Sequence, residues 1–140
     1  MILLDTSVLI AVAQVSHEHH RASRKLWNRC ARKNSAVSVH TLAELYSALT
    51  SMPPALRLRP RDAVLAVETF LLRLTPIDLA AEEYLETFRR AATAGFSGGI
   101  VYDALHLSCA RKCGAKQIYT LNLRHFRAVA PDLAARIVSP

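Results

Sequence analysis

The chain has 140 residues, of which 51% are hydrophobic, and its 18 Lys and Arg against 11 Asp and Glu give a formal net charge of +7. This length and composition predict one globular domain over residues 1–140 and exclude an intrinsically disordered chain. The positive charge predicts an acidic partner, such as nucleic acid, an anionic membrane surface or an acidic protein, although a solvated basic surface would give the same charge.

Short apolar segments alternate with amphipathic ones along the whole chain. The expected strands are residues 2–4, 36–39, 75–78, 117–121 and, at an edge of the sheet, 137–138. The expected helices are residues 6–13, 16 or 17 to 33, 41–51, 61–72, 80–94, 100–112 and a short one after Asn122. The clearest boundaries are the proline-containing loop 53–60, the break at 95–99 and Gly114 as a C-cap. This alternation predicts an α/β fold, a three-layer α/β/α sandwich around a mostly parallel sheet of four to five strands.

The three cysteines are an odd number, and Cys109 and Cys113 are four residues apart, so they would share one face of a helix. Free thiols in a reducing cytoplasm explain them better than a disulfide framework. The apolar N-terminus lacks a basic region and is interrupted by Asp5, which argues against a signal peptide. No apolar run has the length of a membrane span. We therefore expect a cytoplasmic protein that does not enter a membrane.

Three of the scarce acids interrupt apolar segments. Asp5 follows the first strand, Glu44 lies in Leu42–Tyr46, and Asp103 lies in Ile100–Leu105. A buried carboxylate is costly unless something positive satisfies it. Ligands of open α/β sheets bind beyond the carboxyl ends of the strands, and all three acids are expected to face that edge. Oxygen ligands with room for water suit Mg²⁺ or Mn²⁺, so the pattern indicates a metal site.

Each acid also has a purely structural explanation. Asp5 can cap the helix that follows it, Thr41 and Glu44 fit a capping box, and Asp103 in a first turn would interact favourably with the helix dipole. Asp103 is the clearest site candidate, because a carboxylate that only stabilises a dipole belongs on the solvent face. It instead shares the stripe expected to face inward with Ile100, Ala104, Leu107 and Ala110.

Four segments carry a resemblance to a known family, and they lie in the expected order over nearly the whole chain. They are Leu3–Ile10, Leu42–Leu45, Tyr102–His106, and Tyr119–Asn122 followed by His125 and Phe126. In these segments the chain resembles the PIN-domain family, specifically the small VapC-like ribonuclease toxins of type II toxin–antitoxin systems. The resemblance implies an α/β/α sandwich and an Mg²⁺- or Mn²⁺-dependent endoribonuclease that leaves 5′-phosphate and 3′-hydroxyl ends. It also implies a neutralising antitoxin, a homodimer and a cytoplasmic location.

Carried onto this sequence, the resemblance implies that Asp5, Glu44 and Asp103 ligate the metal. Thr6 and Thr120 would supply hydroxyls near the metal or the scissile phosphate. The family often has a further acid in its last motif, where this chain has Asn122 and His125. Asn122 would either offer a neutral oxygen to the site or cap the last helix. Without that negative charge, we expect one well-held ion, with a second arriving together with RNA.

Two functions stay open at this point. One is the metal-dependent RNase toxin, and the other is a catalytically weak or inactive PIN-fold module that binds RNA or protein, for which the missing acid is the motive. A phospho-acceptor signalling domain also gathers acids at strand ends, but it needs a lysine near them. Lys116 comes before a late strand and so lies at the opposite end from the acids, which ranks this function low.

Several basic residues have two interpretations. His106 would either orient Asp103 or be a structural histidine. The remaining residues are RNA contacts or solvated side chains: Arg21, Arg24, Lys25, Arg29, Arg32, Arg124 and Arg127.

Overall fold

A five-stranded sheet forms the middle layer of the computed structural model, which describes all 140 residues. The strand order is β3-β2-β1-β4-β5, and every neighbouring pair is parallel. The strands are β1 (Ile2–Leu4), β2 (Ser35–Ser38), β3 (Thr75–Ile77), β4 (Gln117–Tyr119) and β5 (Ile137–Val138). The helices are α1 (Thr6–Ala13), α2 (His20–Trp27), α3 (Val39–Ser51), α4 (Pro60–Leu71), α5 (Ala81–Thr93), α6 (Ile100–Lys112), α7 (Leu123–Val129) and the 3₁₀ helix η1 (Pro131–Arg136).

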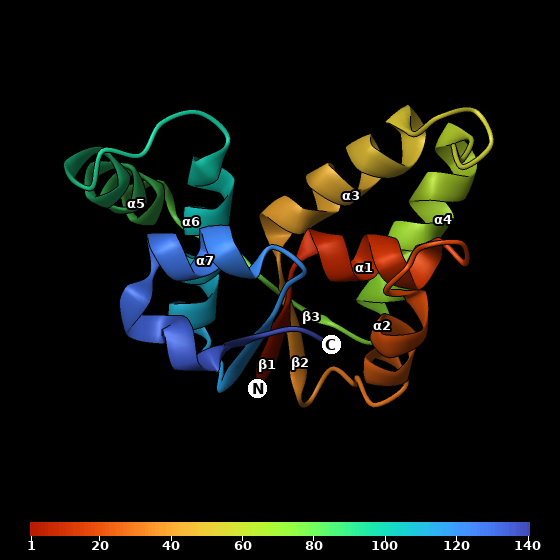
Figure 1. Ribbon diagram of the computed structural model, residues 1–140, viewed down its shortest axis with the longest axis horizontal. Coiled ribbons are helices and arrows are strands. Elements are labelled where there is room, and N and C mark those ends of the chain that lie inside the picture. The colour runs from red at the N-terminus through yellow and green to blue at the C-terminus, as the bar shows by residue number, and fades with distance from the viewer.

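The helices cover both faces of this sheet, as the sequence predicts. Helices α1 to α4 lie to the right of the strands in Figure 1, and α5 to α7 lie to the left. Side chains alternate between the faces of a strand, and β1 shows how this divides the core. Leu4 packs into a cluster with residues of α1 to α4, whereas Leu3 packs into a second cluster with residues of α6, α7 and β4. Both leucines are fully buried, so β1 is the centre of both hydrophobic clusters.

Helix α2 is much shorter than the sequence suggested, and the expected extension to Lys33 is wrong. The backbone N–H groups of Arg29 and Cys30 bond to carbonyls only three residues earlier, which closes the last turn. Asn34 then accepts from the N–H of Ala31 and donates to the carbonyl of Arg29. These side-chain bonds replace the helical ladder and direct the chain into β2.

Helix α3 begins at Val39, two residues earlier than predicted. Its N-cap is Ser38, whose Oγ accepts from the N–H of His40 at 3.1 Å. The capping box proposed for Thr41 and Glu44 is therefore wrong, and both side chains are available for contacts elsewhere. On α4, Ala63 and Phe70 are the buried positions, whereas Val64 is 46% exposed.

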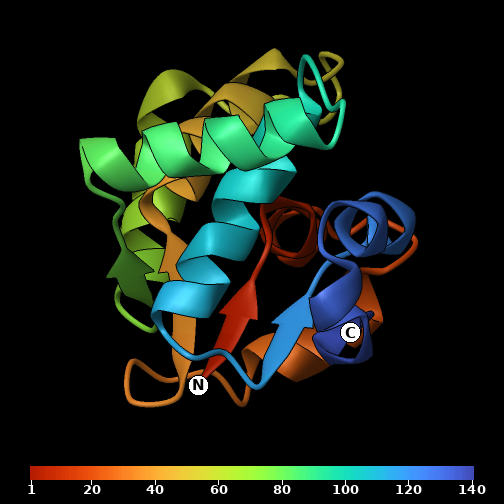
Figure 2. The same ribbon diagram turned by 90° about the vertical axis from the view of Figure 1, so that its left-hand side faces the viewer.

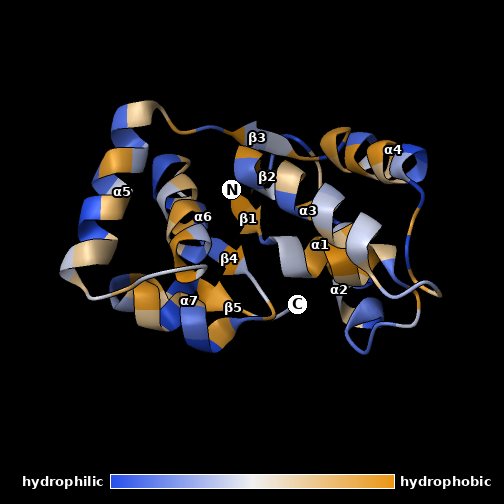
Figure 3. Ribbon diagram, turned by 90° about the horizontal axis from the view of Figure 1, so that it is seen from above, coloured by the Kyte–Doolittle hydropathy of each residue, from blue (hydrophilic) through white to orange (hydrophobic).

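The strand order reverses its direction at β1. The chain passes from β1 to β2 and β3 on one side, and to β4 and β5 on the other. Figure 2 shows the strands pointing the same way, and Figure 3, seen from above, shows α1, α3, α6 and α7 around the ends of the central strands. The central strands carry the hydrophobic colour in that view. A crevice at such a switch point is where open α/β sheets bind ligands.

The three cysteines are free, as predicted, with Cys30 and Cys109 buried. Burial raises the pKa of each of these thiols. None of the helices combines the length and the apolar character needed to cross a membrane.

Candidate active site at the carboxyl edge of the sheet

The three predicted acids come together at the carboxyl edge of the sheet, although they belong to three separate elements. Asp5 lies between β1 and α1, Glu44 lies in the second turn of α3, and Asp103 lies in the first turn of α6. Asp5 and Glu44 are linked through His106 of α6, whose Nε2 is 2.8 Å from Glu44 Oε2 and 3.7 Å from Asp5 Oδ1. The negative field of Asp5 also acts on Asp103. Asp5 and Glu44 therefore meet at His106, and Asp103 lies near enough to Asp5 to interact with its charge.

Asp5 is both a helix cap and a member of this cluster, so its two interpretations are compatible. Its Oδ2 accepts from the N–H of Ser7 at 3.4 Å, which caps α1, and from the hydroxyl of Ser7 at 2.6 Å. The hydroxyl of Thr120, which follows β4, donates to the same oxygen at 2.9 Å. Asp5 is only 5% exposed. These bonds leave Oδ1 as the oxygen that faces His106.

Glu44 is fixed through one of its two oxygens. The Thr6 hydroxyl and the His106 imidazole both bond to Oε2. Burial by itself would raise the pKa of Glu44, but the bond and charge of His106 and the bond from Thr6 outweigh burial and lower it. Glu44 is therefore ionised at neutral pH, with Oε1 turned toward His40 Nε2 at 3.5 Å.

Asp103 has weaker partners than the other two acids. Asn122 Nδ2 is 3.5 Å from its Oδ2, and His125 Nδ1 is 3.8 Å from the same oxygen. Burial, followed by the nearby charge of Asp5, raises the pKa of Asp103 to about 6. Asn122 occupies the N-cap position of α7, but its side chain makes no capping bond. The structure thus places Asn122 against Asp103 and His125 instead of the helix end.

His106 is the site residue whose partner the sequence did not reveal. The sequence left open whether it orients Asp103 or is a structural histidine, and the acids that it contacts are Glu44 and Asp5. The ring is 1% exposed, and its Nδ1 lies 3.4 Å from the Thr41 hydroxyl. Burial lowers the pKa of an imidazole, but the Glu44 bond and the charges of Asp5, Glu44 and Asp103 raise that of His106 above its ordinary value. The sequence feature that could have pointed to His106 as a site residue is its place as a polar residue inside the apolar stretch of α6.

Two further contacts come from residues that were not among the predicted site residues. Ser7 bonds to Asp5 and also accepts from the N–H of Leu121, which connects α1 to the segment after β4. Thr41, which looked like half of a capping box, is fully buried against His106. The bond between Ser7 and Leu121 and the contact between Thr41 and His106 have no local sequence signal, because in each case the partner lies on a distant segment.

The oxygens of this cluster suit a hard cation, although they do not form a finished cage. No three His, Cys, Asp or Glu side chains of the chain stand around one point as metal ligands. The contacts explain why the acids do not surround one point. Asp5 Oδ2 accepts hydrogen bonds from the hydroxyls of Ser7 and Thr120, and Glu44 Oε2 is bonded to His106. Mg²⁺ usually keeps several waters and takes only one or two carboxylates from the protein. Asp5 Oδ1 and the weakly compensated Asp103 fit that requirement.

The basic helix α2 does not border the acids. In both side views it lies toward the amino ends of the strands, away from the edge that carries the cluster. Arg127 has a structural partner, because its guanidinium donates to the carbonyl of Ile137 at 2.9 Å. His20, the first residue of α2, bonds through Nδ1 to the carbonyl of Ala11 at 2.8 Å.

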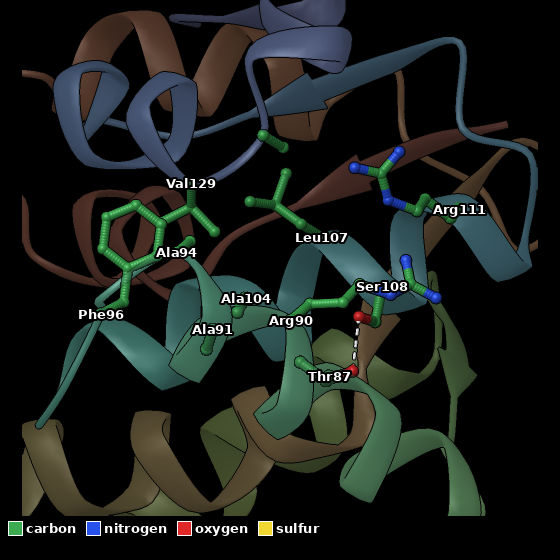
Figure 4. Close-up of a pocket in the computed structure, with 11 residues that line it drawn as sticks. Thr87, Arg90, Ala91, Ala94, Phe96, Ala104, Leu107, Ser108, Arg111 and Val129 are labelled. Carbon is green, nitrogen blue, oxygen red and sulfur yellow. Dashed lines mark hydrogen bonds between the residues drawn. The ribbon is translucent and has the colours of Figure 1, made fainter.

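A separate small cavity of about 70 Å³ lies between α5, α6 and α7 (Figure 4). Thr87 and Ser108 lie side by side in its wall and are hydrogen-bonded, with their hydroxyl oxygens 2.8 Å apart. Ala104, Leu107, Ser108 and Arg111 present one face of α6 to this cavity, and His106 presents another face to the acids. The cavity is therefore distinct from the acid cluster.

Comparison with known proteins identifies the family of this chain. The PIN-domain family model matches residues 2–131. The chain is 39% identical over 103 residues to "Ribonuclease VapC27" of Mycobacterium tuberculosis, which covers 73% of this chain and 71% of that protein. It is 35% identical over 127 residues to "Ribonuclease VapC40" of the same organism, which covers 89% of this chain and 88% of that protein.

Solved structures share the fold at lower sequence identity. VapC20 of Mycobacterium tuberculosis, described as a "Sarcin-Ricin loop cleaving toxin", has a TM-score of 0.75 and 20% identity, over 91% of this chain and 95% of that one. VapBC2 from Rickettsia felis, solved with a DNA fragment from its promoter, has a TM-score of 0.61 and 24% identity, over 91% and 92% of the two chains.

Proposed function

Because this chain belongs to the PIN-domain family and to its VapC ribonuclease branch, we propose that it is an Mg²⁺- or Mn²⁺-dependent endoribonuclease that acts as the toxin of a toxin–antitoxin pair. The observation that carries this proposal is the gathering of Asp5, Glu44 and Asp103 at the switch point of the sheet, around a buried histidine. A partly buried set of acids in a chain of net charge +7 fits a cation held against a polyanion.

The roles of the individual side chains follow from their contacts. Asp5 and Asp103 would hold the cation, whereas Thr120 and Ser7 fix Asp5, and Thr6 and His106 fix Glu44. Glu44 keeps Oε1 free to ligate the ion or to accept a proton from a water. Asn122, beside Asp103, supplies a neutral amide where a further acid is common in the family. When bound, the divalent ion lowers the pKa of a water and offsets charge on the phosphate.

Other features of the proposal rest on the related proteins. Structures of toxin–antitoxin complexes from Klebsiella pneumoniae and Haemophilus influenzae have TM-scores of 0.67, which supports a cognate antitoxin for this chain. The family match over residues 2–131 supports one domain. A homodimer and a cytoplasmic location complete the proposal.

An inactive module that binds RNA or protein is the second candidate. Two observations favour it. Asn122 stands where the family often has an acid, and no three His, Cys, Asp or Glu side chains are placed to hold one metal ion. Metal-dependent cleavage separates the two functions.

The test is cleavage of single-stranded RNA by the purified chain with Mg²⁺, with Mn²⁺ and with a chelator. We expect cleavage only with metal, and a loss of more than about 100-fold in Asp103→Asn, since outer contacts of metal sites alone change activity by 10- to 100-fold. Asp62→Asn is the matched control, because Asp62 is a surface acid paired with Arg59. Equal, chelator-resistant cleavage by wild type and Asp103→Asn would contradict the proposal.

A further inference from the structure

An aromatic pair stands at the rim of the acid cluster. Tyr102, in the first turn of α6, stacks on His40, in the first turn of α3, with ring centroids 4.8 Å apart and an angle of 21° between the planes. Both helices begin at the carboxyl edge of the sheet, and they contact each other there. The pair therefore bridges α3 and α6 on the side where Glu44 and Asp103 lie.

The pair has a buried side and an open side. His40 lies inside, with its ring 5.9 Å from the ring of His106 and its Nε2 3.5 Å from Glu44 Oε1. Tyr102 lies outside and is 47% exposed. Because one face of the tyrosine ring is covered by His40, its exposed area is on the face and edges that point away from the protein. The residue that precedes Asp103 thus offers a flat aromatic surface, backed by His40, to solvent.

The chemistry of this surface matches an unpaired nucleobase. Every base has a π-face that stacks on an aromatic side chain, and this contact is tolerant of sequence. Bases inside a double helix are already stacked, so the partner must come from a single-stranded or looped segment. Building on the proposed function, we propose that Tyr102, supported by His40, is a stacking platform for one unpaired base of the RNA next to the phosphate that is cut.

The first test is binding without cleavage. Short fluorescein-labelled single-stranded RNA is titrated with protein in a chelator, and the dissociation constant is measured by anisotropy. Tyr102→Ala should bind about 5- to 100-fold more weakly, the loss expected for one base stack. Tyr102→Phe keeps the ring and should bind like wild type, whereas Tyr102→Leu keeps apolar area without a π-face and should resemble the alanine variant.

Phe88→Ala is the matched control. Phe88 is an exposed aromatic residue, 41% accessible, that contacts the ring of Tyr84 on α5, away from the acids. Its loss should leave RNA binding unchanged. Thermal unfolding of each variant identifies any loss of folded protein.

The second test identifies the base. Removing one base at a time from the RNA, as an abasic nucleotide, should weaken wild-type binding strongly at one position, adjacent to the cleavage site mapped with Mg²⁺. The same abasic RNA should cost Tyr102→Ala almost nothing, because the stack is already lost. This non-additivity assigns the contact to Tyr102.

The outcomes separate this inference from the nuclease proposal. If wild type cuts RNA but Tyr102→Ala binds and cuts like Tyr102→Phe, the platform is wrong and the nuclease stands. If the stacking signature appears in the chelator but no cleavage occurs with metal, the platform stands and the nuclease is wrong. Failure of wild type to bind any single-stranded RNA would overturn the platform.

Discussion

At the scale of single residues, the site contains two acids whose negative charge is satisfied by hydrogen-bond donors, and one acid whose charge is not. Asp5 accepts three hydrogen bonds, and Glu44 is bonded by Thr6 and His106. Asp103 has only contacts of 3.5 Å or longer, and its pKa is raised to about 6 by burial and by Asp5. Such an acid costs stability as long as no cation accompanies it, and this cost is typical of a functional site.

The cost of Asp103 predicts a stability effect that depends on pH. Between pH 3.8 and about 6 the folded protein keeps a proton that the unfolded chain has lost, so stability falls as the pH rises through this range. In metal-free protein at about pH 8, Asp103→Asn should therefore raise the free energy of unfolding by about 1 to 2 kcal/mol, after allowance for solvent screening. Urea denaturation measures this difference.

Two controls test the predicted stability gain of Asp103→Asn. Near pH 4 the wild-type carboxyl is largely protonated, so the gain from Asp103→Asn should shrink. Asp62→Asn, which removes a surface charge paired with Arg59, should not raise stability at either pH. An Asp103→Asn variant that is no more stable than wild type at pH 8 would show that Asp103 is compensated in solution.

At the scale of elements, α3 has the greatest influence on the site. Its first two turns contribute His40, Thr41 and Glu44, and its start is fixed by Ser38. Ser38 is 2% exposed and also accepts a weak bond from the thiol of Cys109 on α6. The cap therefore sets both the beginning of the helix and its position against α6.

Ser38→Ala should lower the free energy of unfolding by about 1 kcal/mol, because the N–H of His40 loses its acceptor. Ser47→Ala is the matched control, since Ser47 is an exposed residue in the middle of the same helix. That control should be neutral or slightly stabilising, because alanine is the better helix former. Equal urea midpoints for the two variants would mean that Ser38 does not act as the cap.

At the scale of the whole molecule, the sheet joins two hydrophobic clusters into one structure. Leu49 of α3 belongs to the cluster beneath α1 to α4, and Ile118 of β4 belongs to the cluster beneath α6 and α7. Both are fully buried. Because neighbouring residues of β1 contribute to both clusters, neither half of the fold has a sheet of its own, which argues for one cooperative domain.

Leu49→Ala and Ile118→Ala should each lower the free energy of unfolding by about 2 to 5 kcal/mol. Both should shift the same single transition, observed by circular dichroism and by Trp27 fluorescence. Trp27 reports the first cluster, to which it belongs. If Ile118→Ala left the Trp27 transition in place while the overall helix signal melted earlier, the chain would consist of two folding units.

The sequence by itself determined the order of strands and helices, the parallel sheet and the edge at which the acids gather. These features depend on hydrophobic periodicity and on glycine and proline positions, which are local properties of the chain. The family-linked positions Asp5, Glu44 and Asp103 were found in the same way, because charged residues stand out inside apolar segments. The end of α2 and the cap of α3 were misjudged, because one or two side-chain bonds decide such boundaries.

Only the tertiary structure decided which side chains meet. His106 bonds to Glu44 across 62 residues of sequence, Thr41 meets His106 across 65, and Thr6 meets Glu44 across 38. The stack of His40 and Tyr102 likewise joins two helices that follow different strands. Such contacts depend on how α1, α3 and α6 are positioned around the sheet. That positioning results from packing over the whole core, which a local pattern does not encode.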